Sequence, residues 1–195
     1  MVHEVFEKLP QIAPGDEQAA LEVILNNHGI TDEQTVQEFI AHYAPLAERF
    51  RTTPQGRAAT DPQALRELPF VLEVGRWRVR GVIDLLYNDQ GASRVIDYKT
   101  DMISENQVLD KNMHYRLQLE LYALAALQGM PHVERVLAGL YFVEPDVFGE
   151  PLEVTRTGAQ EILDRVEPML EQMEALHRQC EQGAYKLAAC EAEGK

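Results

Sequence analysis

The spacing of apolar residues changes along this chain, and this change limits the possible folds more than any other feature. Over the first 50 residues, apolar side chains recur every three or four positions, as on a helix. From 68 to 99, runs rich in Val, Ile, Leu and aromatic residues have the pattern of strands. Helical spacing returns at 107–127 and in a last segment, with strand-like runs at 133–143 and 152–155 between them. This order indicates an α/β domain built on one sheet.

The strand-like runs in the middle of the chain predict an antiparallel meander. They cover 68–74, 78–87 and 93–99. The turn sequences Gly75-Arg76 and Asn88-Asp89-Gln90-Gly91 separate them. Short turns of this composition join antiparallel neighbours, so we expect three paired strands at the start of the sheet.

We expect a single domain made of three parts. Residues 1–62 form a helical segment in which Thr31 caps one helix and 52–62, with two prolines and a glycine, is a linking loop. Residues 63–156 form the sheet core, including the helix 107–127. A last helix covers 157–182.

Length and composition exclude several classes of protein. The chain has 195 residues, enough for one domain with a sizeable core. Its apolar stretches are far shorter than the ~18 residues of a membrane span, so we expect no membrane partner. The two cysteines, Cys180 and Cys190, do not make a disulfide framework. We therefore expect a reducing, cytoplasmic location.

The charge argues against a protein that coats nucleic acid by electrostatics alone. There are 32 acidic and 18 basic residues, a formal net charge of −14. The acidity lies mostly at the two ends, because residues 67–143 carry a net charge of only −2. A nucleic-acid enzyme remains compatible with this charge if another part delivers the strand.

Two of the strand-like runs place carboxylates among apolar neighbours. Asp97 and Lys99 are two residues apart and share one face of their strand. Pairing across the Asn88–Gly91 turn brings Asp84 opposite Asp97. Two carboxylates at one spot repel unless a divalent cation lies between them, and oxygen ligands suit Mg²⁺ or Mn²⁺. With a lysine beside it, this set suits phosphodiester hydrolysis, although an ordinary ion pair at a strand end remains the alternative.

The helix expected at 107–127 carries a polar face. Gln118 and Tyr122 lie one turn apart, and Tyr115 extends the same face by three residues. Either this face serves the same site or it is a half-exposed helix edge.

Arginines alternate along the second strand. Arg76, Arg78 and Arg80 share one strand face, and without a bulge that face also carries Asp84. Arginines beside a metal site suit phosphate contact. The alternative is an exposed edge protected against aggregation.

Taken together, these motifs resemble the RecB-type branch of the PD-(D/E)xK nuclease superfamily, as found in RecB and AddA helicase–nucleases of the UvrD type. The family pattern is a G-hh-D strand, a D-x-K strand and then Q-x3-Y on a helix. Here it reads Gly81 to Asp84, Asp97 to Lys99 and Gln118 to Tyr122, in that order. Val2-His3-Glu4-Val5-Phe6 is similar to the family's upstream histidine motif, and Glu67-Leu68-Pro69-Phe70 to its E-x-P-F context.

The resemblance implies the fold and the roles of individual residues. The fold would be a restriction-endonuclease-like core, with one mixed central sheet begun by the meander and flanked by helices. His3, Asp84 and Asp97 would be metal ligands together with the Tyr98 carbonyl, and Lys99 would act on water or the phosphate. Glu67 would either assist the metal site or cap the strand. The residues expected to contact DNA are Arg78, Arg80, Tyr115, Gln118 and Tyr122, of which Gln118 and Tyr122 also steady Lys99.

The resemblance also implies a biological setting. It predicts a Mg²⁺- or Mn²⁺-dependent exonuclease that hydrolyses DNA in double-strand-break repair and recombination, fed by a helicase motor domain. The chain begins inside the histidine motif, so we expect a fragment of a larger helicase–nuclease. Some relatives bind an iron–sulfur cluster, but this chain lacks their early cysteine, and we expect no cluster here. The alternatives are a catalytically idle scaffold that binds DNA ends or proteins, and a stand-alone exonuclease.

Overall fold

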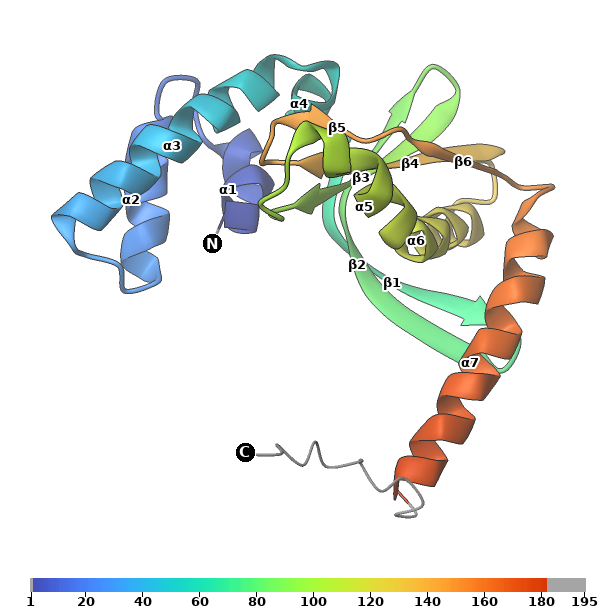
Figure 1. Ribbon diagram of the computed structural model, residues 1–195. Helices are drawn as coiled ribbons and strands as arrows, with labels where there is room; N and C mark the ends of the chain where they lie inside the picture. Colours follow the sequence, from blue (N-terminus) through green and yellow to red (C-terminus); the bar gives the residue numbers. More distant parts are fainter. Residues whose placement is uncertain (1, 182–195) are drawn as a thin grey trace, which may run out of the picture.

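The computed structural model describes residues 2–181 and contains one mixed, six-stranded sheet. The strands follow the order β1-β2-β3-β4-β5, and β6 also pairs with β4. Only β3 and β4 are parallel. Helices flank this sheet (Figure 1), so the expected α/β architecture is confirmed. The bounds are β1 Leu65–Val74, β2 Trp77–Asp89, β3 Ala92–Lys99, β4 Arg135–Phe142, β5 Val147–Phe148 and β6 Leu152–Thr155.

The parallel pair requires a crossover, which two helices and a 3₁₀ turn provide. The turn η2 covers Glu105–Gln107, α5 covers Val108–His114 and α6 covers Arg116–Gly129. The prediction of one helix over 107–127 was therefore wrong, because the helix breaks at Tyr115. The hydroxyl of Tyr115 donates to Asp101 Oδ2 at 3.0 Å and its ring lies 4.1 Å from Lys99 Nζ. These contacts fix Tyr115 at the break between α5 and α6.

The N-terminal segment forms four helices. They are α1 Val2–Lys8, α2 Glu17–Asn27, α3 Glu33–Thr52 and α4 Pro54–Ala59, with a 3₁₀ turn η1 at Leu9–Gln11. The cap of α3 is Asp32, whose side chain accepts from Thr35 N, rather than Thr31. The loop expected at 52–62 was also wrong. There Thr53 caps α4 by accepting from Gly56 N, and Pro54 occupies the first helical turn, where proline is favourable.

Hydrophobic clusters lie on both faces of the sheet. On one face the aromatic rings of Phe6, Phe50 and Tyr141 pack together and fix α1 and α3 to the strands. On the other face α6 buries Leu119 and Ala123 against Ile83 and its neighbours. The sheet is therefore clamped between the N-terminal helices and α6, and its strands are held at fixed positions.

The β1–β2 hairpin continues beyond the rest of the sheet and packs against the last helix (Figure 1). This helix, α7, covers Ala159–Glu181, and its Val166 packs with Leu72 and Val74 of β1. Residue 182, where the sequence predicted its end, lies outside the described residues. The prediction that Arg76 shares the strand face of Arg78 was wrong. Arg76 lies in the hairpin turn, over the Trp77 ring, and donates a hydrogen bond to Glu174 of α7.

Between residues 2 and 181 no helix has both the length and the apolar character needed to cross a membrane.

Candidate active site

Neighbouring strands bring the two predicted carboxylates together. The β2–β3 register pairs Leu85 with Ile96, so Asp84 and Asp97 are the next positions along the two strands. Both are buried, with 7% and 3% of their surface exposed. The backbone N–H of Tyr98 donates to Asp84 Oδ2 at 2.8 Å. Asp84 is therefore tied to the strand that carries Asp97.

The regular alternation of side chains along β2 is interrupted next to Asp84. Ile83 packs in the cluster beneath α6, whereas Leu85 packs in the cluster beneath the N-terminal helices. Glu67 of β1 lies between the residues that pair with Ile83 and Leu85, and it has a left-handed backbone with φ 47°. A non-glycine residue in this conformation is uncommon, and such strain clusters at functional sites. The distortion places the Glu67 carboxylate near the first helix.

Asp97, Lys99 and Gln118 form a connected network. Lys99 Nζ lies 2.8 Å from Asp97 Oδ2 and donates to Gln118 Oε1 at 3.0 Å. Gln118 Nε2 donates to Asp97 Oδ1 at 3.0 Å and contacts the Tyr122 hydroxyl oxygen at 2.7 Å. The ring of Tyr115 lies beside Lys99 Nζ. The predicted D-x-K strand and Q-x3-Y helix therefore meet, and Gln118 is the residue that joins them.

One buried oxygen of this network lacks a regular partner. Asp97 Oδ2 is inaccessible and, among the described residues, accepts no hydrogen bond of good geometry, although Lys99 Nζ is close. Burial, and next the charge of Asp84, raise the pKa of the Asp97 carboxyl. Lys99 already supplies one positive charge to Asp97, but Asp84 adds a second carboxylate at the same place, and a divalent cation would compensate this further charge. The donor set therefore fits a divalent cation.

His3 reaches the same place from α1. Its Nε2 lies 2.9 Å from Asp84 Oδ2, and its Nδ1 contacts Glu7 Oε1 one helical turn further on. The hydrogen bond to Asp84, more than any other interaction, raises the pKa of His3 to about 9, although burial opposes this. Ligand atoms of His3, Glu7 and Glu67 lie within 4.8 Å of one another. Each upstream residue predicted for the site is therefore near Asp84.

Glu7 was not identified from the sequence. Its spacing of four residues from His3 puts both on one helix face, and this was the signal that could have revealed it. The sequence reasoning also missed Asp101, whose Oδ1 lies 2.8 Å from Lys111 Nζ and whose Oδ2 accepts from Tyr115. Lys111 is the main cause that lowers the pKa of Asp101. This pair holds Tyr115 beside Lys99.

The predicted arginines lie on the exposed side of the hairpin. The β1–β2 register is unbroken from Glu73↔Arg78 to Leu68↔Ile83, so Arg78 and Arg80 point to the face opposite Ile83. Asp84 points to the same side, because it contacts His3 of α1, whereas Ile83 packs beneath α6. Both arginines are exposed, and Arg78 Nε is 3.7 Å from Glu73 Oε1. They form a row that leads away from the carboxylates along the hairpin.

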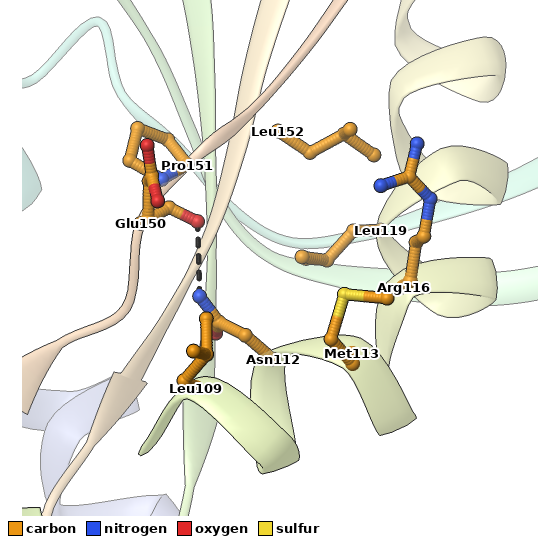
Figure 2. A pocket seen from close by; sticks show the side chains of 8 residues that line it. All are labelled: Leu109, Asn112, Met113, Arg116, Leu119, Glu150, Pro151 and Leu152. Atoms are coloured by element: carbon orange, nitrogen blue, oxygen red, sulfur yellow. Dashed lines mark hydrogen bonds between the residues drawn. The ribbon is translucent and has the colours of Figure 1, made fainter. Parts of the chain in front are cut away.

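A small pocket of about 150 Å³ lies between α5, α6 and the loop before β6 (Figure 2). Asn112 Nδ2 donates to the Glu150 carbonyl oxygen at 3.0 Å across it. Leu109 and Met113 of α5 line it with largely exposed side chains. None of the carboxylates described above lines this pocket, so it is separate from the cluster at Asp84 and Asp97.

The cysteines are placed only in part. Cys180 is an exposed free thiol on α7, and Cys190 lies outside the described residues.

Comparison with known proteins agrees with this geometry. The model of the PD-(D/E)XK nuclease superfamily matches residues 1–193. Members of this superfamily are generally nucleases that act on DNA with divalent metal ions.

Two curated relatives share part of the sequence. They are ATP-dependent helicase/nuclease subunits from Thermoanaerobacter sp. (strain X514) and Thermoanaerobacter pseudethanolicus (strain ATCC 33223 / 39E). Each is 28% identical over 91 residues, which cover 39% of this chain and 7% of the relative's length.

A solved structure titled "Crystal structure of SSO0001" aligns with 87% of this chain and 74% of its own, at a TM-score of 0.37 and 18% identity. The family match extends over nearly the whole chain. The chain therefore belongs to the PD-(D/E)XK nuclease superfamily.

Proposed function

We propose that this protein is a metal-dependent deoxyribonuclease that hydrolyses phosphodiester bonds of DNA as an exonuclease. The observation that carries the proposal is the convergence of Asp84, Asp97 and Lys99, with a buried Asp97 oxygen that lacks a regular hydrogen bond. A surface ion pair needs neither the burial nor the second carboxylate. A bound divalent cation would account for both.

The residues that would hold the cation are His3, Asp84, Asp97 and the carbonyl group of Tyr98. Three oxygens suit Mg²⁺ or Mn²⁺, and the imidazole nitrogen shifts the preference somewhat towards Mn²⁺. A bound divalent cation would supply Lewis-acid stabilisation of negative charge on the phosphate. Glu67, whose carboxylate lies near His3 and Glu7, would assist this site.

Lys99 is the group that would act on the reacting atoms. Its ammonium is held between Asp97 and Gln118 and lies against the Tyr115 ring, so it has little freedom to move. An ammonium fixed in this way orients the attacking water and stabilises charge on the phosphate. Gln118 and Tyr122 would hold Lys99 in place and, with Tyr115, contact the DNA backbone.

Arg78 and Arg80 would bind phosphates of the strand as it enters or leaves. Their exposed guanidinium groups lie on the strand face that ends at Asp84. Guanidinium groups match phosphate oxygens in geometry and charge. Most of the acidic surplus lies outside residues 67–143, so these arginines face less repulsion of DNA than the net charge of −14 suggests.

We further propose that this domain works with a helicase motor in the cytoplasm, in repair and recombination of DNA breaks. The supporting observation is the 28% identity to the helicase/nuclease relatives, of whose length the aligned segment is 7%. A partner motor would deliver the strand that an acidic domain binds only weakly.

A cleavage assay tests the proposal. Linear single- and double-stranded DNA is incubated with the wild type, Asp97→Ala and Lys99→Ala in the presence of Mg²⁺, Mn²⁺ or EDTA. We expect cleavage by the wild type with either metal, none with EDTA, and a loss of about 100-fold or more in both variants. Metal-independent cleavage, or equal cleavage by the variants, contradicts the proposal. DNA binding without any cleavage would instead favour the idle scaffold.

A further inference from the structure

We propose that Glu7 is a positioning residue that fixes the His3 ring so that its Nε2 faces Asp84. The inference rests on the proposed function, because it concerns a ligand of the same metal centre. It assigns a role to a residue that the carboxylate motifs do not include.

Two contacts on opposite sides of the imidazole carry the inference. Nδ1 of His3 contacts Glu7 Oε1, and Nε2 lies 2.9 Å from Asp84 Oδ2. With a carboxylate at each nitrogen, both ring nitrogens donate when no cation is present. A cation beside Asp84 would replace the Nε2 proton, which leaves to solvent, while Glu7 keeps the proton on Nδ1. Histidines that bind metals nearly always donate their other N–H to such a group, which fixes the ring and its tautomer.

The apolar contacts of the His3 ring do not determine its orientation about Cβ–Cγ, whereas the contact with Glu7 does. The Tyr98 ring packs edge-on against His3 with centroids 5.8 Å apart, and Phe6 packs behind Tyr98. These apolar contacts restrict tilting but do not tell a nitrogen from a carbon. A half-turn about Cβ–Cγ would put carbons where both nitrogens now lie. The Glu7 carboxylate opposes that turn because it would lose the hydrogen bond from Nδ1.

The helix that holds both residues is itself fixed. Val5, Phe6 and Leu9 are almost completely buried, so α1 is anchored to the core on the side next to His3. Because His3 and Glu7 lie four residues apart on this helix, their contact forms without ordering any further segment. The His3–Glu7 contact is therefore present before a cation binds.

Glu67 makes a competing arrangement possible. His3, Glu7 and Glu67 lie close enough together to hold a second cation. We favour the positioning role because Nδ1 already contacts Glu7 directly and Nε2 faces Asp84. The number of bound cations distinguishes the two arrangements.

The experiment measures Mn²⁺ binding to the whole chain by isothermal titration calorimetry. The variants are Glu7→Ala, Glu7→Gln and, as a matched control, Glu4→Ala. Glu4 lies on the same helix and contacts Lys8 and His28 instead of His3. We expect Glu7→Ala to weaken Mn²⁺ binding about 10- to 100-fold at unchanged stoichiometry, the usual loss for such partners. Glu7→Gln should recover most of the affinity because its amide oxygen still accepts from Nδ1.

Thermal unfolding separates this role from a structural one. Glu7→Ala removes one carboxylate contact of α1 and Glu4→Ala removes two part-exposed ones, so the midpoint of Glu7→Ala without metal should fall no further than that of Glu4→Ala. Unchanged Mn²⁺ affinity in Glu7→Ala overturns the inference, as does the loss of a whole equivalent of Mn²⁺, which would make Glu7 a ligand. Failure of the proposed function has a different signature, namely equal Mn²⁺ binding by the wild type and Asp97→Ala.

Discussion

At the scale of single residues, the amide of Gln118 organises the site. Its oxygen accepts from Lys99 and its nitrogen donates to Asp97, so one side chain sets the distance between the ammonium and the carboxylate. Strand and helix periods placed Asp97 with Lys99 and Gln118 with Tyr122, but only the resemblance to the nuclease family implied that the two pairs meet. The sequence could not predict the role of Glu7, since a Glu four residues after a His is also typical of a solvated helix face.

The first prediction concerns Gln118. Gln118→Ala should lower the single-turnover rate of DNA cleavage about 100-fold, because a displacement of about 1 Å at a catalytic group has this effect. Gln128→Ala is the matched control. Gln128 lies at the opposite end of the same helix, where its side chain forms hydrogen bonds with the Glu73 backbone. If both variants cleave DNA at similar rates, Gln118 does not position Lys99.

At the scale of elements, the hairpin and α6 fit together through a glycine. Gly81 lies opposite Phe70 in the register, and the Phe70 ring packs edge-on against Tyr122 with centroids 5.7 Å apart. A Cβ at Gly81 would lie 2.6 Å from Phe70 Cζ, which is too close. The glycine of the G-hh-D strand therefore makes room for the ring that supports Tyr122.

This contact leads to the second prediction. Gly81→Ala should lower the free energy of unfolding by about 1–3 kcal/mol, the usual cost of overpacking, and should also reduce cleavage by shifting Tyr122. Gly139→Ala in β4 is the control, because its new Cβ would be 3.7 Å from Pro151 Cβ, an ordinary contact. Denaturant unfolding of both variants measures the difference. Equal stability would show that Phe70 moves aside at little cost.

The strands followed from the sequence more faithfully than the helices. The meander was predicted because β-branched residues and turn residues are local signals, and the register then placed Asp84 beside Asp97. The break at Tyr115 was not predictable, because it depends on Asp101 and Lys99, which contact Tyr115 only in the fold. The short helix α4 had a local signal in Thr53-Pro54, which the proline count of the segment obscured.

At the scale of the whole molecule, the charge distribution suits a protein to which a partner delivers the DNA strand. Most of the acidic surplus lies outside residues 67–143, and the exposed row of Arg78 and Arg80 leads to the carboxylates. The fold places this row on the long hairpin, which α7 supports from its other face. Which face the hairpin exposes could be read from strand alternation. The support from α7 could not, because it depends on tertiary packing.

The third prediction concerns DNA binding. The logarithm of the affinity should fall linearly with the logarithm of the salt concentration, and Arg78→Ala and Arg80→Ala should each reduce the slope by about 0.7–0.9, the value for one lost phosphate contact. Fluorescence anisotropy with labelled DNA in Ca²⁺ or EDTA measures this. Arg178→Ala is the control, because Arg178 pairs with Glu174 on α7. A slope that changes only in the control would place the DNA elsewhere.

The central claim is that the buried carboxylates hold the cation that DNA cleavage requires. Anomalous diffraction from crystals grown with Mn²⁺ tests it most directly. We predict a Mn²⁺ peak in contact with Asp84, Asp97 and the Tyr98 carbonyl oxygen, with His3 Nε2 as a further ligand. A peak bound only by surface carboxylates, or a site in which Asp97 keeps its contacts with Lys99 and Gln118 and no Mn²⁺ is present, would contradict the claim.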